Sequence, residues 1–206
     1  MSWLARLLPI SGDQSDERAM RAVQERADPA AFAKLVNRWE APIRRLCTRM
    51  TGDEHFGEDL AQETFARVFA HRHQFLPDRK FSTWLWRIAV NLCHEQGRRK
   101  RLPQSPLEDE VLACERSEQL ETDEEATLVR AALSELPDKL REVVVLREYE
   151  GLKFREVAEI LQIPLGTVQS RMADALNQLS RKLRPFVDVN EREVDSHVAS
   201  NCRPTG

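Results

Sequence analysis

The stretch from 151 to 183 constrains the fold most, because it reads as two short helices joined by a tight turn. Gln162-Ile163-Pro164 interrupts the helical pattern, since proline cannot continue a helix and biases the residue before it towards extended geometry. We expect Gly166-Thr167 to open the second helix, with Thr167 as its cap. The apolar residues at helical spacing are Phe154, Val157, Ala158 and Leu161 before the turn, and Val168, Met172, Ala175, Leu179 and Leu183 after it.

Two helices joined in this way are typical of a helix-turn-helix, whose second helix offers its N-terminal residues to base edges in the major groove of DNA. An ordinary helical hairpin with a solvated face is the alternative. The small Ala158 at the expected helix crossing and Ile163 in the turn favour the DNA-binding interpretation. The outward-facing candidates for upstream DNA contact are Thr167, Gln169, Ser170 and Arg171.

The length of 206 residues allows one domain or two small ones, and the composition predicts an all-α chain. There are only 7 glycines in 206 residues, and no strand-like alternation is present. The net charge of −3 argues against a uniformly basic nucleic-acid coat. The first ten residues are too short and too interrupted, by Arg6 and Pro9, for a membrane span or a signal peptide. The cysteines are far apart, which indicates a reduced cytoplasmic protein without disulfides or a zinc site: Cys47, Cys93, Cys114 and Cys202.

Helical periodicity and breakers divide the first half of the chain. Asp28 should cap a helix that has Pro29 at its first position and runs to about Met50, with a kink at Pro42. Thr51-Gly52-Asp53 is a stop signal. The other predicted helices cover 15–26, 58–71 and 81–101, and a loop covers 74–80.

The predicted organisation is an N-terminal arm, a helical domain, an acidic linker, a helix-turn-helix domain and a polar tail that we expect to be disordered. The linker carries nine acidic residues against Arg116 alone, and two prolines open it. In the same order the five segments are 1–28, 29–101, 102–125, 126–187 and 188–206.

The predicted helix 81–101 and the two residues before it carry seven basic residues against the single acid Glu95. Aromatic rings interleaved with cations suit unpaired DNA, because bases stack on the rings while the cations hold phosphates. The alternative is that Trp84 and Trp86 both belong to the core. The face apart from the buried stripe carries Trp84, Arg87, Asn91 and Arg98.

The helix 58–71 presents Glu58, Asp59 and Glu63 together with Gln62 and Arg67, which is either a solvated face or a docking surface for a protein. No catalytic constellation, phosphate-binding glycine loop or nucleophile elbow is found, so an enzyme is not predicted. His71 and His73 near Asp78 are assigned to a DNA-facing loop rather than to a metal, and no cofactor is expected.

The chain from about Pro29 to Arg184 resembles a bacterial RNA polymerase sigma factor of the extracytoplasmic-function (ECF) group. Each motif is weak alone, but the set in this order is specific. The motifs are Met50-Thr51-Gly52-Asp53, EDLAQETFARVF (58–69), FSTWLWRIAVN (81–91), the Arg98-Arg99 pair, and LSELPDKLREVVVLREYEGLKFREVAEIL followed by GTVQSRM.

The resemblance implies a region-two domain and a region-four domain that together bind core polymerase and promoter DNA. Region four would read the −35 element through the four helix-turn-helix residues above and contact the β flap. An anti-sigma factor is a further implied partner, and no membrane insertion is expected. The β′ clamp helices would contact Asp59, Gln62, Glu63 and Arg67, and the −10 strand would contact Gln74, Phe75, Asp78, Arg79, Lys80, Trp84, Arg87, Asn91, Arg98 and Arg99.

Two positions depart from the family pattern. Ala173 and Asp174 follow the Ser-Arg pair where the family often carries arginines or an aromatic residue, and Asp174 would repel phosphate. His94 stands near a position where the family often has Asp.

Two other functions are alternatives to a sigma factor: a dimeric helix-turn-helix regulator that acts without core polymerase, and a helical adaptor without DNA activity.

Overall fold

The protein is described by a computed structural model covering residues 14–101 and 124–200, with side chains described for 15–99 and 126–184. Every element in these ranges is a helix, which confirms the all-α prediction. The apolar N-terminal arm, nearly all of the acidic linker, and Cys114 and Cys202 lie outside the described residues. None of the described helices is long and apolar enough to cross a membrane.

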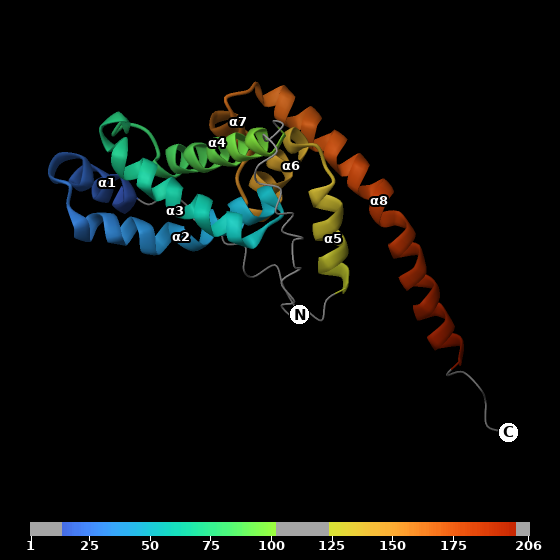
Figure 1. The fold of residues 1–206 in the computed structure, drawn as a ribbon. Helices are drawn as coiled ribbons and strands as arrows, with labels where there is room; N and C mark the ends of the chain where they lie inside the picture. Colours follow the sequence, from blue (N-terminus) through green and yellow to red (C-terminus); the bar gives the residue numbers. More distant parts are fainter. Residues whose placement is uncertain (1–13, 102–123, 201–206) are drawn as a thin grey trace, which may run out of the picture.

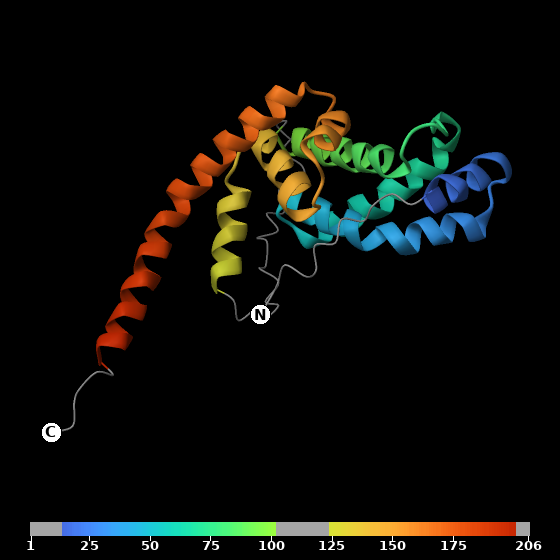
Figure 2. The same ribbon diagram turned by 180° about the vertical axis from the view of Figure 1, so that it is seen from behind.

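The helices form two groups that lie side by side (Figures 1 and 2). The first group is α1 (Gln14–Arg26), α2 (Pro29–Thr51), α3 (Glu54–Ala70), the 3₁₀ turn η2 (Arg72–Gln74) and α4 (Phe81–Arg101). The second is α5 (Glu124–Ser134), α6 (Asp138–Val144), the π-helix η3 (Val145–Tyr149), α7 (Phe154–Leu161) and α8 (Leu165–Ser200).

The ends of α2 follow the sequence signals. The Asp28 carboxylate accepts hydrogen bonds from the backbone N–H groups of Ala30 at 2.9 Å and Ala31 at 3.1 Å, and Pro29 occupies the first helical position. Gly52 ends the helix with φ 75°, a left-handed conformation that glycine adopts without a Cβ penalty. The predicted cap and stop are both confirmed.

The start of α3 differs from the prediction, because the helix begins at Glu54 rather than Glu58. Asp53, which the sequence marked as part of a stop, caps it by accepting from the N–H of Phe56 at 3.1 Å. Gly57 lies inside the helix where α3 crosses α2. A Cβ at that position would lie 2.8 Å from the backbone nitrogen of Thr48, so this close crossing requires glycine.

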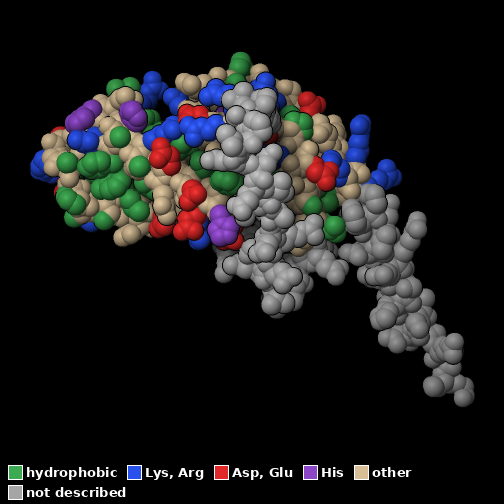
Figure 3. Space-filling view, in the orientation of Figure 1, with side chains coloured by type: hydrophobic (Ala, Val, Ile, Leu, Met, Phe, Trp, Pro, Cys, Tyr) green, Lys and Arg blue, Asp and Glu red, His purple; other side chains and the backbone are tan. Residues whose placement is uncertain are grey.

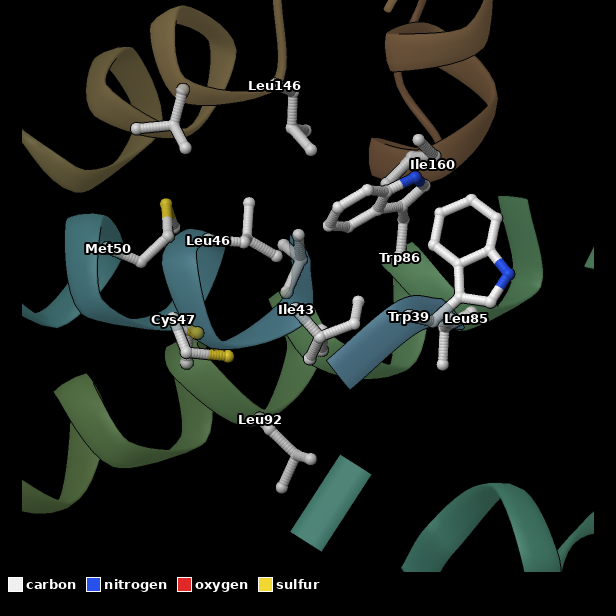
Figure 4. Packing of buried hydrophobic residues seen from close by; sticks show 14 of the residues in the cluster. Trp39, Ile43, Leu46, Cys47, Met50, Leu85, Trp86, Leu92, Leu146 and Ile160 are labelled. Atoms are coloured by element: carbon white, nitrogen blue, oxygen red, sulfur yellow. The ribbon is translucent and has the colours of Figure 1, made fainter. Parts of the chain in front are cut away.

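One apolar core runs through both groups of helices. Leu46 of α2 and Trp86 of α4 belong to the same buried cluster as Leu146 and Ile160 of the second group (Figure 4). α7 packs against α4, while α5, α6 and η3 pack against α2. The two predicted domains are therefore docked on each other in this structure.

The two cysteines of the first group, Cys47 and Cys93, are buried free thiols. Contact with the Cys47 thiol, together with burial, raises the pKa of Cys93 well above its ordinary value. The Cys93 thiol is therefore protonated and poorly nucleophilic at neutral pH.

The helix-turn-helix consists of α7 and α8, with Gln162 in the left-handed conformation (φ 55°) between them. The inner stripe is confirmed, since Val168 and Ala175 are fully buried. The predicted Thr167 cap is wrong: α8 begins at Leu165, and the Thr167 N–H already donates to the Pro164 carbonyl at 2.9 Å. The expected disorder beyond 188 is also wrong as far as Ser200, because α8 continues to that residue.

Candidate nucleic-acid interface

α1 holds the loop between η2 and α4 in place. The Gln24 side chain donates to the carbonyl of Phe75 at 3.0 Å, and the N–H of Phe81 donates to the Glu17 carboxylate at 2.9 Å. Glu17 thereby satisfies a free N–H at the start of α4. Sequence reasoning missed both residues, because 51 and 64 positions separate these partners and no local pattern joins them.

Within the loop, Phe75 differs from its neighbours. It is 1% exposed and packs against Phe81 and Trp84, with ring centroids 6.1 and 5.5 Å away. In this position Phe75 supports the loop from inside and presents no surface to DNA. The other predicted contacts are exposed, namely Gln74, Asp78, Arg79 and Lys80, and so is Leu76, which sequence reasoning did not select.

The two tryptophans of α4 have different surroundings. Trp86 is 3% exposed, with its ring 5.8 Å from that of Trp39, so the core alternative holds for Trp86. Trp84 is half-buried at the edge of the Phe75–Phe81 cluster and keeps an accessible face. Asn91, Arg98 and Arg99 are exposed further along the helix.

Two of the predicted downstream contacts touch α7. Lys80 Nζ lies 2.9 Å from the Glu156 carboxylate, and Arg87 Nη2 donates to the Glu159 carbonyl at 2.8 Å. Burial raises the pKa of Glu156, but hydrogen bonds from the Lys153 backbone and from Lys80 outweigh it, and the net pKa is lowered. Glu156 is therefore ionised at neutral pH and forms an ion pair with Lys80.

The predicted upstream contacts are not equivalent. Gln169 and Ser170 are exposed at the front of α8, and Thr167 is half-buried. Arg171 turns inward, with Nη1 2.8 Å from a carboxylate oxygen of Glu142, which is 2% exposed. The other carboxylate oxygen of Glu142 lies 2.6 Å from His94 Nε2 of α4. The structure thus brings Arg171 together with His94 through an acid that sequence reasoning did not single out.

The candidate docking surface on α3 is exposed and acidic. Asp59, Gln62 and Glu63 lie on the surface, whereas Arg67 binds Glu63 at 3.0 Å and Glu95 of α4 at 2.8 Å. Hydrogen bonds to Glu95 and Glu63 raise the pKa of Arg67, and the bond from Arg67 lowers the pKa of Glu95. On the face drawn in Figure 3, acidic side chains lie over α3, with basic side chains beside them over α4.

A further ion pair joins the two groups of helices near the end of α2. Arg49 Nη1 lies 3.4 Å from the Glu150 carboxylate, and its guanidinium stands 4.4 Å from the centroid of the Tyr149 ring. Burial raises the pKa of Glu150 to about 7, although Arg49 opposes the shift. At physiological pH the Glu150 carboxyl is therefore partly protonated, and its ion pair with Arg49 is only partly formed.

The stability of the docked chain is expected to fall as pH rises from 5 to 8. The hydrogen bond to Glu142 raises the pKa of His94, so its stabilising contribution is complete below about 6.5 and is lost as pH rises through the folded value. Glu150 acts in the same direction, because burial raises its pKa from 4.5 to about 7, and stability falls with pH between these two values as the unfolded chain ionises first. Calorimetric Tm values across this range test the sign. Glu150→Gln together with His94→Gln should flatten the profile, and a profile unchanged in the double variant contradicts the assignment.

Two family models match the chain, one over part of each group of helices. Sigma-70 region 2 matches residues 35–102, and Sigma-70, region 4 matches residues 126–179. The matches therefore contain α4, α7 and the first part of α8.

Curated proteins similar to the chain carry sigma-factor names. It is 37% identical over 174 residues to the ECF RNA polymerase sigma factor SigW of Bacillus subtilis, which covers 78% of this chain and 92% of that protein. It is 33% identical over 189 residues to the RNA polymerase sigma-H factor of Pseudomonas aeruginosa, covering 84% and 96%.

Solved structures share the fold. CnrH in complex with the cytosolic domain of CnrY superposes with a TM-score of 0.64 at 22% identity, over 83% of this chain and 98% of that one. The sigma factor RpoE in complex with the anti-sigma factor NepR from Bartonella quintana gives a TM-score of 0.58 at 20% identity, over 74% and 96%. At these identities the likeness concerns the fold alone.

Proposed function

The chain belongs to the ECF group of sigma-70 RNA polymerase sigma factors, and from this premise we propose how its residues divide the work of promoter recognition. As a sigma factor it binds core RNA polymerase and directs transcription initiation in the cytoplasm. The two curated relatives named above carry sigma-factor names, which favours this function over a dimeric regulator independent of polymerase.

The downstream −10 element is assigned to the loop and the first half of α4. Exposed cations at Arg79 and Lys80 come a few residues before the half-buried Trp84, and cations combined with an aromatic ring suit single-stranded DNA. Phe75 fixes the loop from beneath. Asn91, Arg98 and Arg99 extend the polar and basic face along the helix.

The upstream −35 element is assigned to the front of α8. Exposed Gln169 and Ser170, with Thr167 beside them, lie in the first turns, where a recognition helix reaches base edges. Arg171 is placed differently, because its guanidinium is held by Glu142. We assign Arg171 to positioning of the helix in this conformation.

Two protein partners are proposed. The exposed acids of α3, Asp59 and Glu63, with Gln62 between them, form a charged surface for the β′ clamp helices of core polymerase, and Arg67 braces that surface against α4. Region four would contact the β flap. An anti-sigma factor is the second partner, since the structural neighbour from Bartonella quintana is bound to one.

The observation that carries the proposal is the pairing of a half-exposed Trp84 with loop cations in one domain and a helix-turn-helix in the other. The test is whether the purified chain comigrates with core polymerase and confers run-off transcription on a genomic promoter library. A chain that binds duplex DNA as a dimer but does not associate with core would favour the regulator instead.

Trp84→Ala is expected to impair promoter opening more than closed-complex formation. Stacking on an aromatic ring contributes about 1–3 kcal/mol per base, and that contribution exists only when the strand is unpaired. Permanganate reactivity of thymines in the bubble should fall, while closed-complex affinity on duplex promoter should change little. Trp84→Phe, which keeps a ring, is the matched control. Unchanged reactivity in Trp84→Ala would return Trp84 to a purely structural role.

A further inference from the structure

The loop assigned to the −10 strand is tied to α1 at both of its ends. Before the loop, Gln24 Nε2 donates to the Phe75 carbonyl at 3.0 Å, and after it the Glu17 carboxylate accepts from the Phe81 N–H at 2.9 Å. All the residues between these two points, 76–80, are exposed. The exposed part of the loop, which would meet DNA, therefore begins and ends beside a hydrogen bond to α1.

The spacing of the two α1 residues matters because a helix is stiff. Glu17 and Gln24 are two helical turns apart, so they lie on the same face of α1, about 10 Å from each other along the helix axis. An exposed loop has many backbone conformations of its own, and each one that is excluded costs conformational entropy. By holding both ends, α1 limits the conformations that are open to the loop.

α1 is itself held tightly on α2. Met20 and Val23 of α1 are fully buried. Asp16 is 4% exposed, accepts a hydrogen bond from Trp39 Nε1 at 3.0 Å and lies 3.2 Å from Arg38 Nη1. Displacing α1 would leave these buried polar groups without partners, which is costly. The helix is therefore a fixed support for the loop.

The hydrogen bonds from α1 do something that the aromatic packing beneath the loop does not. Phe75 packs against Phe81 and Trp84, but apolar contacts have no preferred direction. Hydrogen bonds to backbone groups are directional, so Gln24 and Glu17 fix the orientation of a peptide group at each end of the loop. The aromatic rings hold the loop on the core, and α1 determines how it is presented.

We propose that Glu17 and Gln24 are positioning residues for −10 recognition, which hold the loop in the conformation that discriminates between bases of the unpaired strand. The inference rests on the proposed function of the loop. Discrimination needs contact groups held to within about 0.5 Å, which supporting residues provide. Both residues act through backbone groups and precede residues 35–102, so α1 extends the recognition machinery beyond the Sigma-70 region 2 match.

Two isosteric exchanges separate positioning from general stability. Glu17→Gln keeps a side-chain oxygen that can accept from the Phe81 N–H, whereas Gln24→Glu replaces the amide donor by a carboxylate that repels the Phe75 carbonyl. Initiation with core polymerase is measured on one promoter from the run-off library and on its single-base −10 and −35 substitutions. The readout is the ratio between the parent promoter and each substitution, because a loss of folded protein lowers both and leaves the ratio unchanged.

In Gln24→Glu and in Glu17→Ala, discrimination at the −10 element should fall by about fivefold or more, while discrimination at the −35 element stays the same. Glu17→Gln should retain most of the −10 discrimination. Glu25→Ala, which removes an exposed acid of the same helix, should change neither ratio. Unchanged −10 ratios in Gln24→Glu and Glu17→Ala, with or without a uniform loss of initiation, overturn the positioning role and leave α1 as a part of the fold alone.

Amide hydrogen exchange of the free full-length chain is a measurement that needs no polymerase. The Phe81 N–H and the amides of 76–80 should exchange several-fold faster in Glu17→Ala than in Glu17→Gln, while the amides of α3 exchange equally in both. Equal exchange at Phe81 and in the loop overturns the support by α1, whether or not the chain initiates transcription. A wild-type chain that does not initiate with core polymerase overturns the proposed function instead, and the −10 role of α1 with it.

Discussion

Arg141→Ala is expected to lower the free energy of unfolding by about 3–5 kcal/mol, which is exceptional for one substitution. Its guanidinium donates to the carbonyls of Leu133 at 3.0 Å, Leu136 at 2.8 Å and Met50 at 2.7 Å, with a further bond to Ser134. Leu133 and Ser134 lie at the end of α5, where carbonyls have no partner within the helix. The Arg141 side chain, which is 12% exposed, therefore caps the C-terminus of α5 and links α5 to α2.

The measurement is urea or thermal unfolding of the full chain, with circular dichroism as the probe. Arg141→Lys should recover only part of the loss, because a point ammonium cannot serve carbonyls in several directions as a planar fork does. Arg147→Ala is the matched control, since Arg147 donates to the single carbonyl of Leu152 at 3.0 Å and should cost about 1–2 kcal/mol. Equal losses in the two alanine variants would show that the multiple bonds of Arg141 carry no special stability.

Elements whose signals are local could be predicted from the sequence. α7 is predicted at 154–161 and found at Phe154–Leu161, because its apolar spacing and the following Pro164 act over a few residues. The start of α3 was predicted too late. The sequence places Asp53 at the end of a stop signal, but in the structure this residue is the N-cap of α3. Gly57 lies inside α3 because only a glycine fits the crossing with α2.

Within the candidate site, the sequence identifies contact residues correctly only where the predicted residue lies at an exposed position. Gln169 and Arg79 are exposed as expected, whereas Phe75 is buried, since its place against Phe81 and Trp84 depends on the path of the loop. The interface residues Glu142 and Glu150 carry no sequence signal at all. Glu142 lies in α6 and Glu150 directly follows η3, and their partners His94 and Arg49 are 48 and 101 positions away. Sequence periodicity describes one element at a time and therefore cannot show which charged groups two elements will bury between them.

Arg171→Ala is expected to lower the unfolding free energy by about 3 kcal/mol, because removal of one partner of a buried ion pair leaves the other without compensation. The partner is Glu142, 2% exposed, and His94 offsets part of the loss while it is protonated. The competing expectation, in which Arg171 reads a base bidentately, predicts a loss of about 1–3 kcal/mol in upstream recognition at one base pair and no change in stability. A positioning role therefore changes the free energy of unfolding, whereas a base-reading role changes the affinity for the upstream element.

The double variant Arg171→Ala/Glu142→Leu separates the two roles. Replacing a buried pair by apolar residues is often neutral, so the second substitution should restore most of the stability lost in the first. Upstream binding should recover with it if Arg171 only positions the helix. Gln169→Ala, an exposed neighbour, should leave stability unchanged and weaken upstream binding by itself. Restored stability with upstream discrimination still lost would instead assign Arg171 to base reading in the polymerase-bound state, where the contact with Glu142 must then be broken.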